Sequence, residues 1–472
     1  MGEAGVDGCH GVSLRCAGRS EERYGRSRKT PKGTTGGHLL EPEHALVPAM
    51  ADRHIGRDRS LARADVSLRG PAGGGDETNK GRTVMTKRLL MLIAGAAVLA
   101  GAAVAQEPIR LGAMYPLTGG GAIYGVPAMA GHQLAIEEIN KRGGVMGRKL
   151  ESIERDDKMN PSTASATMKE LITKDNVHLV VGGLSSAVGL GMSEVSKQEK
   201  IVYISTIAKT IQMTTSKLHP HVFRTASNTD LEGDTMAMLV GKYHLKKLCH
   251  LQLDYAYGQD LEIGVVKALP IRAPDAKIVL TLKPKLGATD FNAFIPQVMA
   301  AGCDGVVSGL WGPHFVSWVK QASPLGFFDK IKWISGGEIA AHEIAGELKG
   351  EYPDNVISNT YELWYHSIDP LHKTFQEALA KKLGTNETPQ WAMLGYNGVM
   401  FAAAAIEKAK SLDSDKIAAA LEGLTVNTPV GKLTIDPKTH QANTGQFWGP
   451  MVKKPGKDYR VMEPVEFIQP KS

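Results

Sequence analysis

The sequence predicts an α/β protein made of two doubly wound parallel-sheet lobes. Within residues 106–472, short apolar runs alternate with segments in which apolar residues recur every three or four positions, the spacing of an amphipathic helix. Strands and helices that alternate in this way form parallel sheets covered by helices on both faces. The alternation runs once as far as Arg224 and then restarts, which indicates two lobes in tandem.

The first series contains four strand-like segments separated by helices. The strands are expected at 109–117, 149–154, 177–181 and 201–204. The helix at 126–141 ends at Arg142-Gly143-Gly144, because glycine readily adopts the conformation that closes a helix. Asn160-Pro161 begins the next helix, with asparagine as N-cap and proline in the first turn.

The second series predicts four more strands and then a helical region. The strands are expected at 248–253, 278–282, 305–307 and 331–334. Asp290 caps a helix at 291–300, residues 370–424 are almost entirely helical, and 428–436 is β-type. Ligands of open parallel sheets bind beyond the carboxyl ends of the strands. Two facing lobes would therefore hold a ligand in the cleft between them.

Residues 85–106 have the pattern of a secretory signal peptide. Lys87 and Arg88 precede an uncharged apolar run, and Ala103-Val104-Ala105 is a small-x-small cleavage sequence. The run is shorter than the roughly 20 residues that a membrane-spanning helix needs. We expect Sec-type export to the periplasm with cleavage before Gln106, an uncleaved membrane anchor being the alternative. Because Gln106 is not a cysteine, no lipid anchor is expected.

Residues 1–84 differ in composition from the rest of the chain. They contain 11 Arg and 3 Lys, against 7 Arg and 32 Lys in residues 106–472. Without sustained apolar periodicity, such a segment cannot bury enough apolar surface to offset its ordering entropy. We interpret it as non-native sequence upstream of a start at Met85, and a genuine disordered extension is the alternative.

The part of the chain expected to be exported is nearly neutral and contains no recognisable catalytic motif. It carries 39 basic and 38 acidic side chains, so nucleic-acid binding is not expected. No nucleophile elbow, cofactor loop or metal-ligand cluster stands out, and we expect no catalysis, cofactor or metal. The spacing of Cys249 and Cys303 leaves a disulfide and two buried free thiols both open.

Five segments carry a family resemblance. They are IRLGAMYPLTGGGAIYG at 109–125, IEEINKRGGVMGRKLE at 136–151, VVGGLSS at 180–186, Tyr257-Gly258, and TPVGKLTIDPKTHQ at 428–441. Over nearly all of residues 107–472 the chain resembles the periplasmic substrate-binding proteins of ABC transporters, in the leucine/isoleucine/valine-binding branch.

The resemblance implies a type I periplasmic binding protein, in which three chain crossings form the hinge. Lobe 1 would contain 107–226 and 361–426, and lobe 2 would contain 227–360 and 427–472. We expect a monomeric receptor that closes on a small carboxylate, such as a branched-chain amino acid, and delivers it to an ABC importer. The alternatives are aromatic or deaminated acids as ligands, a ligand sensor for signalling, and a periplasmic α/β enzyme.

Residues after two strands of the first lobe are expected to hold the ligand's carboxylate. Ser185 and Ser186 follow a Gly-Gly turn and precede a helix, whose N–H groups and dipole attract anions; plain N-capping is the alternative. The resemblance assigns this position to the α-carboxylate and matches Ala208 to a residue whose backbone meets it. Lys209 stands where the family often has threonine, and either pairs with the ligand carboxylate or points into solvent.

Four further residues are expected to meet the rest of the ligand. The resemblance places Glu338 where amino-acid binders carry the carboxylate that neutralises the ligand amine. Tyr124, Tyr257 and Trp311 match aromatic positions of the family. Together they would form a cage for an ammonium group or an aromatic ring, whereas each alone is compatible with core packing.

Overall fold

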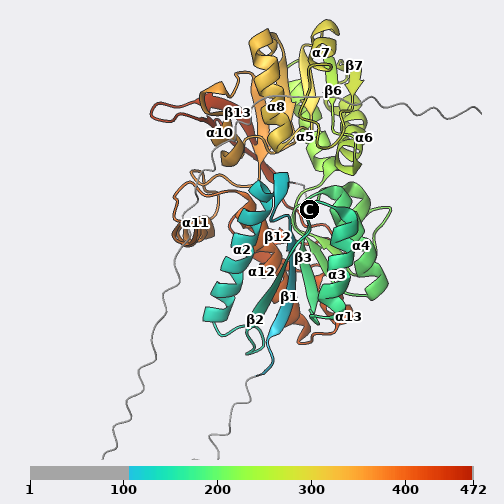
Figure 1. Ribbon diagram of the computed structural model, residues 1–472, viewed down its shortest axis with the longest axis vertical. Coiled ribbons are helices and arrows are strands. Elements are labelled where there is room, and N and C mark those ends of the chain that lie inside the picture. The colour runs from blue at the N-terminus through green and yellow to red at the C-terminus, as the bar shows by residue number, and fades with distance from the viewer. Residues whose placement is uncertain (1–105, 470–472) are drawn as a thin grey trace, which may run out of the picture. The chain divides into compact units, whose positions relative to one another are not determined.

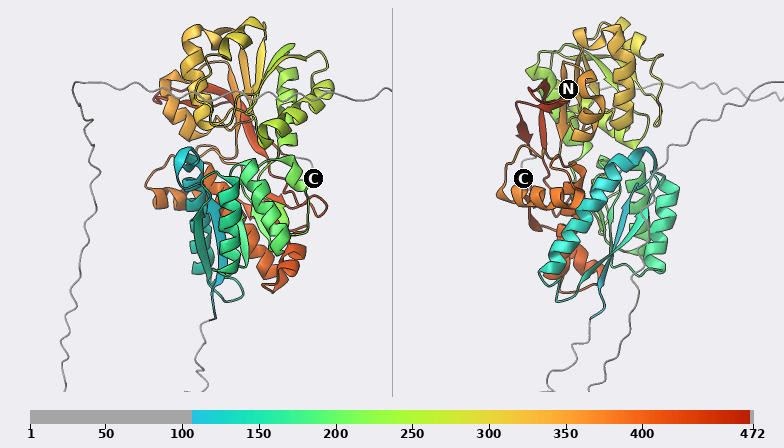
Figure 2. Two further views of the ribbon diagram at one scale, coloured as in Figure 1. Left: turned by 45° about the vertical axis from the view of Figure 1, so that its right-hand side comes forward. Right: turned by 60° about the vertical axis from the view of Figure 1, so that its left-hand side comes forward.

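The computed structural model describes residues 106–469 and contains two α/β lobes (Figure 1). The expected upstream extension and signal peptide, residues 1–105, lie outside the described residues. Among residues 106–469, no helix is both long enough and apolar enough to cross a membrane. The two predicted parallel-sheet lobes are confirmed, and they are stacked one above the other in both views of Figure 2.

The first lobe is built on a five-stranded parallel sheet. Its order is β2-β1-β3-β4-β5, with β1 (Ile109–Tyr115), β2 (Leu150–Asp156), β3 (Leu179–Gly182), β4 (Tyr203–Ser205) and β5 (Val222–Arg224). Side chains of β3 alternate between two cores, because successive residues of a strand point to opposite faces. Val181 packs with one set of helices, and Val180 packs with the other.

Helices cover both faces of this first sheet. α2 (Ala122–Lys141), α12 (Trp391–Ala409) and α13 (Ser414–Leu421) share the core that contains Val181. α3 (Pro161–Thr173) and α4 (Ser186–Glu199) share the opposite core. The expected caps are present, since Asn160 accepts a hydrogen bond from the Thr163 N–H at 2.9 Å and α2 ends immediately before Arg142.

The second lobe is built on an eight-stranded mixed sheet. Its parallel strands are β6 (Lys247–Leu251), β7 (Lys277–Leu282), β8 (Gly305–Ser308), β9 (Lys332–Ser335) and β10 (Val356–Thr360). The antiparallel part is β13 (Gln446–Lys453), β14 (Arg460–Met462) and β15 (Glu466–Ile468). The order β14-β13-β10-β9-β8-β6-β7 places β10 beside the returning C-terminal chain.

Helices also cover both faces of the second sheet. α5 (Thr229–Lys242) and α6 (Ala256–Arg272) pack on one face. α7 (Ile295–Ala300), α8 (Gly312–Ala322), α9 (Phe327–Lys330) and α10 (His342–Leu348) pack on the other. The expected cap at Asp290 differs in the structure, because its carboxylate accepts the Asn292 N–H in a turn and α7 begins only at Ile295.

One segment that the family resemblance assigned to the second lobe lies with the first. The hairpin of β11 (Thr425–Thr428) and β12 (Gly431–Thr434) buries Val426 and Leu433 in the core of the first lobe. Arg224 also forms a bridge with Gln441. The chain therefore returns to the second sheet at β13, about 20 residues after the expected crossing at 427. Alternating burial predicts a buried face for the hairpin but does not say which core receives it.

A disulfide joins Cys249 on β6 to Cys303, just before β8. The Cα atoms are 5.7 Å apart, within the usual range for a disulfide. This resolves the choice between free thiols and a disulfide that the sequence left open. Because both cysteines belong to the second lobe, the bond leaves movement between the lobes unrestrained.

Candidate functional site

A cavity of about 40 Å³ lies between the lobes, beyond the carboxyl ends of β3 and β4 on one side and β8 and β9 on the other. Such a volume has room for about three water molecules, so the lobes are close together here. Its wall is formed by Tyr124, Leu184, Ser185, Ser186, Ile207, Lys209, Tyr255, Tyr257, Trp311, Glu338 and Trp391. The structure thus brings seven of the eight expected site residues to one cavity.

The two serines lie at the N-terminus of α4. The Ser185 hydroxyl accepts the Val188 N–H at 3.2 Å and so caps the helix, while the Ser186 hydroxyl accepts the Thr210 N–H at 3.2 Å. A Cβ on Gly182 would lie 2.0 Å from the Met114 carbonyl oxygen, so only glycine allows the turn into this position. Helix N–H groups without intrahelical acceptors point toward the cavity end of α4. The arrangement suits an anion.

Ala208 is the expected site residue that does not line the cavity. Its N–H donates to the Gly183 carbonyl at 3.1 Å, and its side chain packs in the core beneath α3 and α4. The N–H is thus committed to tying the loop after β4 to the Gly-Gly turn. The structure therefore differs from the expectation that the backbone of Ala208 meets the ligand.

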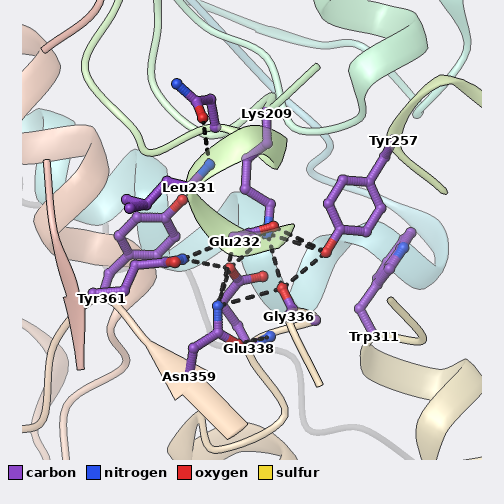
Figure 3. A network of polar contacts seen from close by, with 12 residues as sticks. Lys209, Leu231, Glu232, Tyr257, Trp311, Gly336, Glu338, Asn359 and Tyr361 are labelled. Atoms are coloured by element: carbon purple, nitrogen blue, oxygen red, sulfur yellow. Dashed lines mark hydrogen bonds and ion pairs between the residues drawn. The ribbon is translucent and has the colours of Figure 1, made fainter. Parts of the chain in front are cut away.

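Lys209 reaches across the cleft from the first lobe to the second (Figure 3). Its ammonium nitrogen lies 2.6 Å from an oxygen of Glu232 on α5 and 2.6 Å from an oxygen of Glu338 after β9. It also donates to the Gly336 carbonyl at 3.2 Å and to the Tyr257 hydroxyl at 3.4 Å. Lys209 is 7% exposed. Neither expected role, a ligand-carboxylate partner or a solvent-facing lysine, describes this geometry.

Amide side chains complete the surroundings of the two carboxylates. Gln446 on β13 donates to both Glu232 and Glu338 at 2.9 Å, and Asn359 on β10 donates to Glu338 at 3.2 Å. The Tyr257 hydroxyl hydrogen-bonds Glu232 at 3.2 Å. Sequence reasoning missed three of these residues. Glu232 looks like an ordinary first-turn glutamate, and the two amides stand in strands that the sequence pattern did not predict.

Burial and charge act against each other in this network. Burial alone would lower the pKa of Lys209, but the carboxylates of Glu232 and Glu338 outweigh it and raise that pKa above its ordinary value. Burial raises the pKa of Glu338 to about 8, and Lys209 opposes that rise. Glu338 also has a φ of 50°, and its N–H donates to the Asn359 side chain at 2.9 Å. Strained backbone of this kind is typical of functional sites.

An aromatic wall closes the other side of the cavity. The Tyr124 ring on α2 meets the Trp391 ring at 4.6 Å and the Trp311 ring at 5.5 Å between centroids, both edge to face. The Trp311 indole donates to the Tyr255 hydroxyl at 3.1 Å. Within the described part of the chain, the Tyr124 hydroxyl and the Trp391 indole N–H are buried without a partner.

Residues 106–469 contain no group of three or more His, Cys, Asp or Glu side chains arranged to hold a metal ion. The site consists of three parts, which are the N-terminus of α4, an aromatic wall and an interlobe ion-pair network.

Residues 108–454 match the model of the protein family described as "Periplasmic binding protein". Among curated proteins, the chain is 28% identical over 361 residues to the leucine-, isoleucine-, valine-, threonine- and alanine-binding protein of Pseudomonas aeruginosa, covering 75% of this chain and 93% of that protein. It is 29% identical over 362 residues to Leu/Ile/Val-binding protein homolog 1 of Brucella suis, with the same coverages.

Solved structures share the fold. A solute-binding protein of an ABC transporter from Rhodopseudomonas palustris, in complex with 3,4-dihydroxybenzoic acid, has a TM-score of 0.69 and 24% identity, covering 76% of this chain and 97% of that chain. A branched-chain amino acid transporter substrate-binding protein from Streptococcus pneumoniae, in complex with isoleucine, has a TM-score of 0.68 and 21% identity, covering 77% and 100%.

Proposed function

The chain belongs to the periplasmic binding protein family, and we propose that it captures a small carboxylate outside the cytoplasm and delivers it to the permease of an ABC importer. The family is one of solute receptors and not a class of enzymes. Its members act outside the cytoplasm, which agrees with the exported protein that residues 85–106 predict.

The observation that carries the proposal is the cavity between the lobes, with the end of α4 on one wall and aromatic side chains from both lobes on the other. A ligand that touches both lobes binds the closed arrangement better than the open one, and so shifts the population toward closure. Closure of this kind is how such a receptor signals to its partner that cargo is present.

Within the cavity, we propose that Ser185, Ser186 and the N-terminus of α4 hold the ligand's carboxylate. The aromatic wall of Tyr124, Trp311 and Trp391 would cover its apolar part. The names of the relatives support two ligand classes, since the Pseudomonas aeruginosa protein is named for aliphatic amino acids and the Rhodopseudomonas palustris protein was solved with a dihydroxybenzoate. A sensor that reports the same ligand to a signalling partner is the second candidate.

We also propose that the signal peptide at 85–105 is removed by Sec-type processing before Gln106 and that the protein carries no lipid. Edman sequencing of the protein purified from its natural host tests this. A natural N-terminus at Met1, or a lipid-modified one, would contradict it.

The experiment that tests the proposed function is a thermal-shift screen of residues 106–472, stripped of ligand by unfolding and refolding. Amino acids, their deaminated analogues and benzoate-type acids are added singly. A ligand that binds the folded state raises the melting temperature according to its saturation, and we expect at least one carboxylate to do so. Failure of every carboxylate would overturn the proposal.

Ser185→Asp is the variant that tests the proposed anion site in this screen. Aspartate remains a good N-cap for α4, but its charge repels an anionic ligand. We expect unchanged folding and binding at least about tenfold weaker.

A further inference from the structure

The ion-pair network already contains the ammonium group that an amino-acid ligand would bring. In the closed arrangement the Lys209 nitrogen lies between Glu232 and Glu338, 2.6 Å from each. It also lies 4.6 Å from the centroid of the Tyr257 ring, which is a cation–π distance. The aromatic face and the carboxylates expected to receive a ligand amine are thus engaged by a side chain of the protein.

Lys209 already engages one oxygen of each carboxylate. One oxygen of Glu338 accepts from Lys209, Gln446 and Asn359, and one oxygen of Glu232 accepts from Lys209 and Gln446. Both glutamates are buried, Glu232 completely. Buried carboxylates need partners, and here the protein supplies them to both oxygens of Glu232 and to one oxygen of Glu338.

The cation already in the network acts against a second one. Lys209 lies 2.6 Å from both glutamates, and burial raises the pKa of Glu338 and so disfavours its charged form. A ligand ammonium entering this cluster would have to displace Lys209 or lie beside a like charge in a buried site, which is costly.

From this geometry we infer that Lys209 occupies the amine half of the site, and that the protein selects carboxylates without an α-ammonium group over amino acids. The inference rests on the proposed function and specifies its ligand. What remains beside the ion-pair network is an anion site at α4 and the aromatic wall of Tyr124, Trp311 and Trp391. The chemistry of these two features matches an aromatic acid first and a deaminated branched acid second.

The test compares matched pairs by isothermal titration with the exported chain, residues 106–472. The pairs are phenylalanine with 3-phenylpropionate and leucine with 4-methylpentanoate, and 4-hydroxybenzoate is included as an aromatic acid. With the wild-type protein, we expect the acid of a pair to bind about tenfold or more tightly than its amino acid.

A variant with one free carboxylate tests the role of Lys209 itself. Lys209→Met/Glu232→Gln removes one cation and one anion together, so that Glu338 remains as the partner for a ligand ammonium. We expect this variant to bind the amino acid of a pair more tightly, relative to its acid, by about tenfold or more compared with wild type. Lys217→Met, at an exposed lysine of the same lobe, is the control and should leave the ratio unchanged.

The outcomes separate the inference from the proposed function. Wild-type protein that binds an amino acid as tightly as its deaminated partner, or more tightly, overturns the inference and leaves the receptor role standing. If no carboxylate binds at all, the proposed function itself fails. The wild-type comparison decides the inference even if the double variant does not fold.

Discussion

At the scale of single residues, the pKa of a buried acidic group depends on how many hydrogen-bonding partners it has. Glu338 and Glu232 share hydrogen-bonding partners in one network, whereas Glu343 on α10 has none of them. Both carboxylate oxygens of Glu343 are buried, and neither has a partner among the described residues. Burial raises the pKa of Glu343 to about 8, and the nearby Glu362 adds to the rise.

This makes the stability of the protein depend on pH. Above about pH 5 the unfolded chain has an ionised glutamate, while Glu343 in the folded chain stays protonated up to about pH 8. Stability therefore falls as pH rises from 5 to 8, by about 1.4 kcal/mol per pH unit for this group. Glu343→Gln removes that contribution, so we expect a flatter pH profile and a more stable protein at pH 8.

Urea unfolding at pH 6, 7 and 8 measures this prediction. Glu347→Gln, at an exposed glutamate of the same helix, serves as the control and should keep the wild-type slope. Parallel profiles for wild type and Glu343→Gln would contradict the prediction.

Residue-level prediction from sequence was strongest where a motif fixes the local backbone. The Gly-Gly turn before Ser185 and the strand end before Glu338 bring both residues to the cavity. Glu232, Asn359 and Gln446 could not be found in this way, because each acts through distant partners. Lys209 stood out as a departure from the family, but its partners are 23 and 129 positions away, and sequence spacing carries no information about such contacts.

At the scale of secondary-structure elements, strands and helices with clear periodicity were predicted to within a few residues. Five strands were not predicted: β5, β10 and the C-terminal β13, β14 and β15. Of these, β5 and β10 are short and entirely buried, so they lack the alternation that marks a strand with one exposed face. The hairpin of β11 and β12 alternates clearly, but its place in the first lobe depends on tertiary packing.

The disulfide between β6 and the start of β8 stabilises the second lobe. It closes a loop with a sequence separation of 54 residues, and constraining such a loop in the unfolded chain contributes about 2–4 kcal/mol. Cys249→Ala/Cys303→Ala should lose about this amount of unfolding free energy. Ligand affinity should change little, because neither cysteine lines the cavity.

Urea denaturation with and without reductant checks the disulfide prediction. Reductant should destabilise the wild-type protein and have no effect on the double variant. A wild-type midpoint that does not respond to full reduction, verified by thiol titration, would argue against it.

At the scale of the whole molecule, closure brings Gly312 of one lobe close to Tyr124 of the other. Gly312, the first residue of α8, has a φ of 49°, and a Cβ placed on it would lie 1.9 Å from the Tyr124 hydroxyl oxygen of the other lobe. Gly312→Ala should therefore hold the lobes apart. We expect ligand affinity to fall about tenfold or more, as for other overpacked contacts.

Two variants separate this steric effect from backbone strain. Gly312→Ala/Tyr124→Phe removes the oxygen but keeps the strain, so it should recover part of the affinity. Gly350→Ala, where a Cβ would meet nothing within 4 Å, should bind as wild type does. Small-angle scattering would report the loss of ligand-induced compaction in Gly312→Ala, and full compaction there would rule the mechanism out.

The contact of Lys209 with both lobes has a consequence for how the proposed receptor would dock at the membrane. Part of the attraction that holds the closed form together is built into the protein, because Lys209 belongs to one lobe and its two glutamates belong to the other. An unloaded receptor would therefore also contain a contact that favours a shape resembling the loaded one. At the proposed importer, empty receptors would compete with loaded ones for docking, so that producing more receptor would eventually slow uptake instead of speeding it.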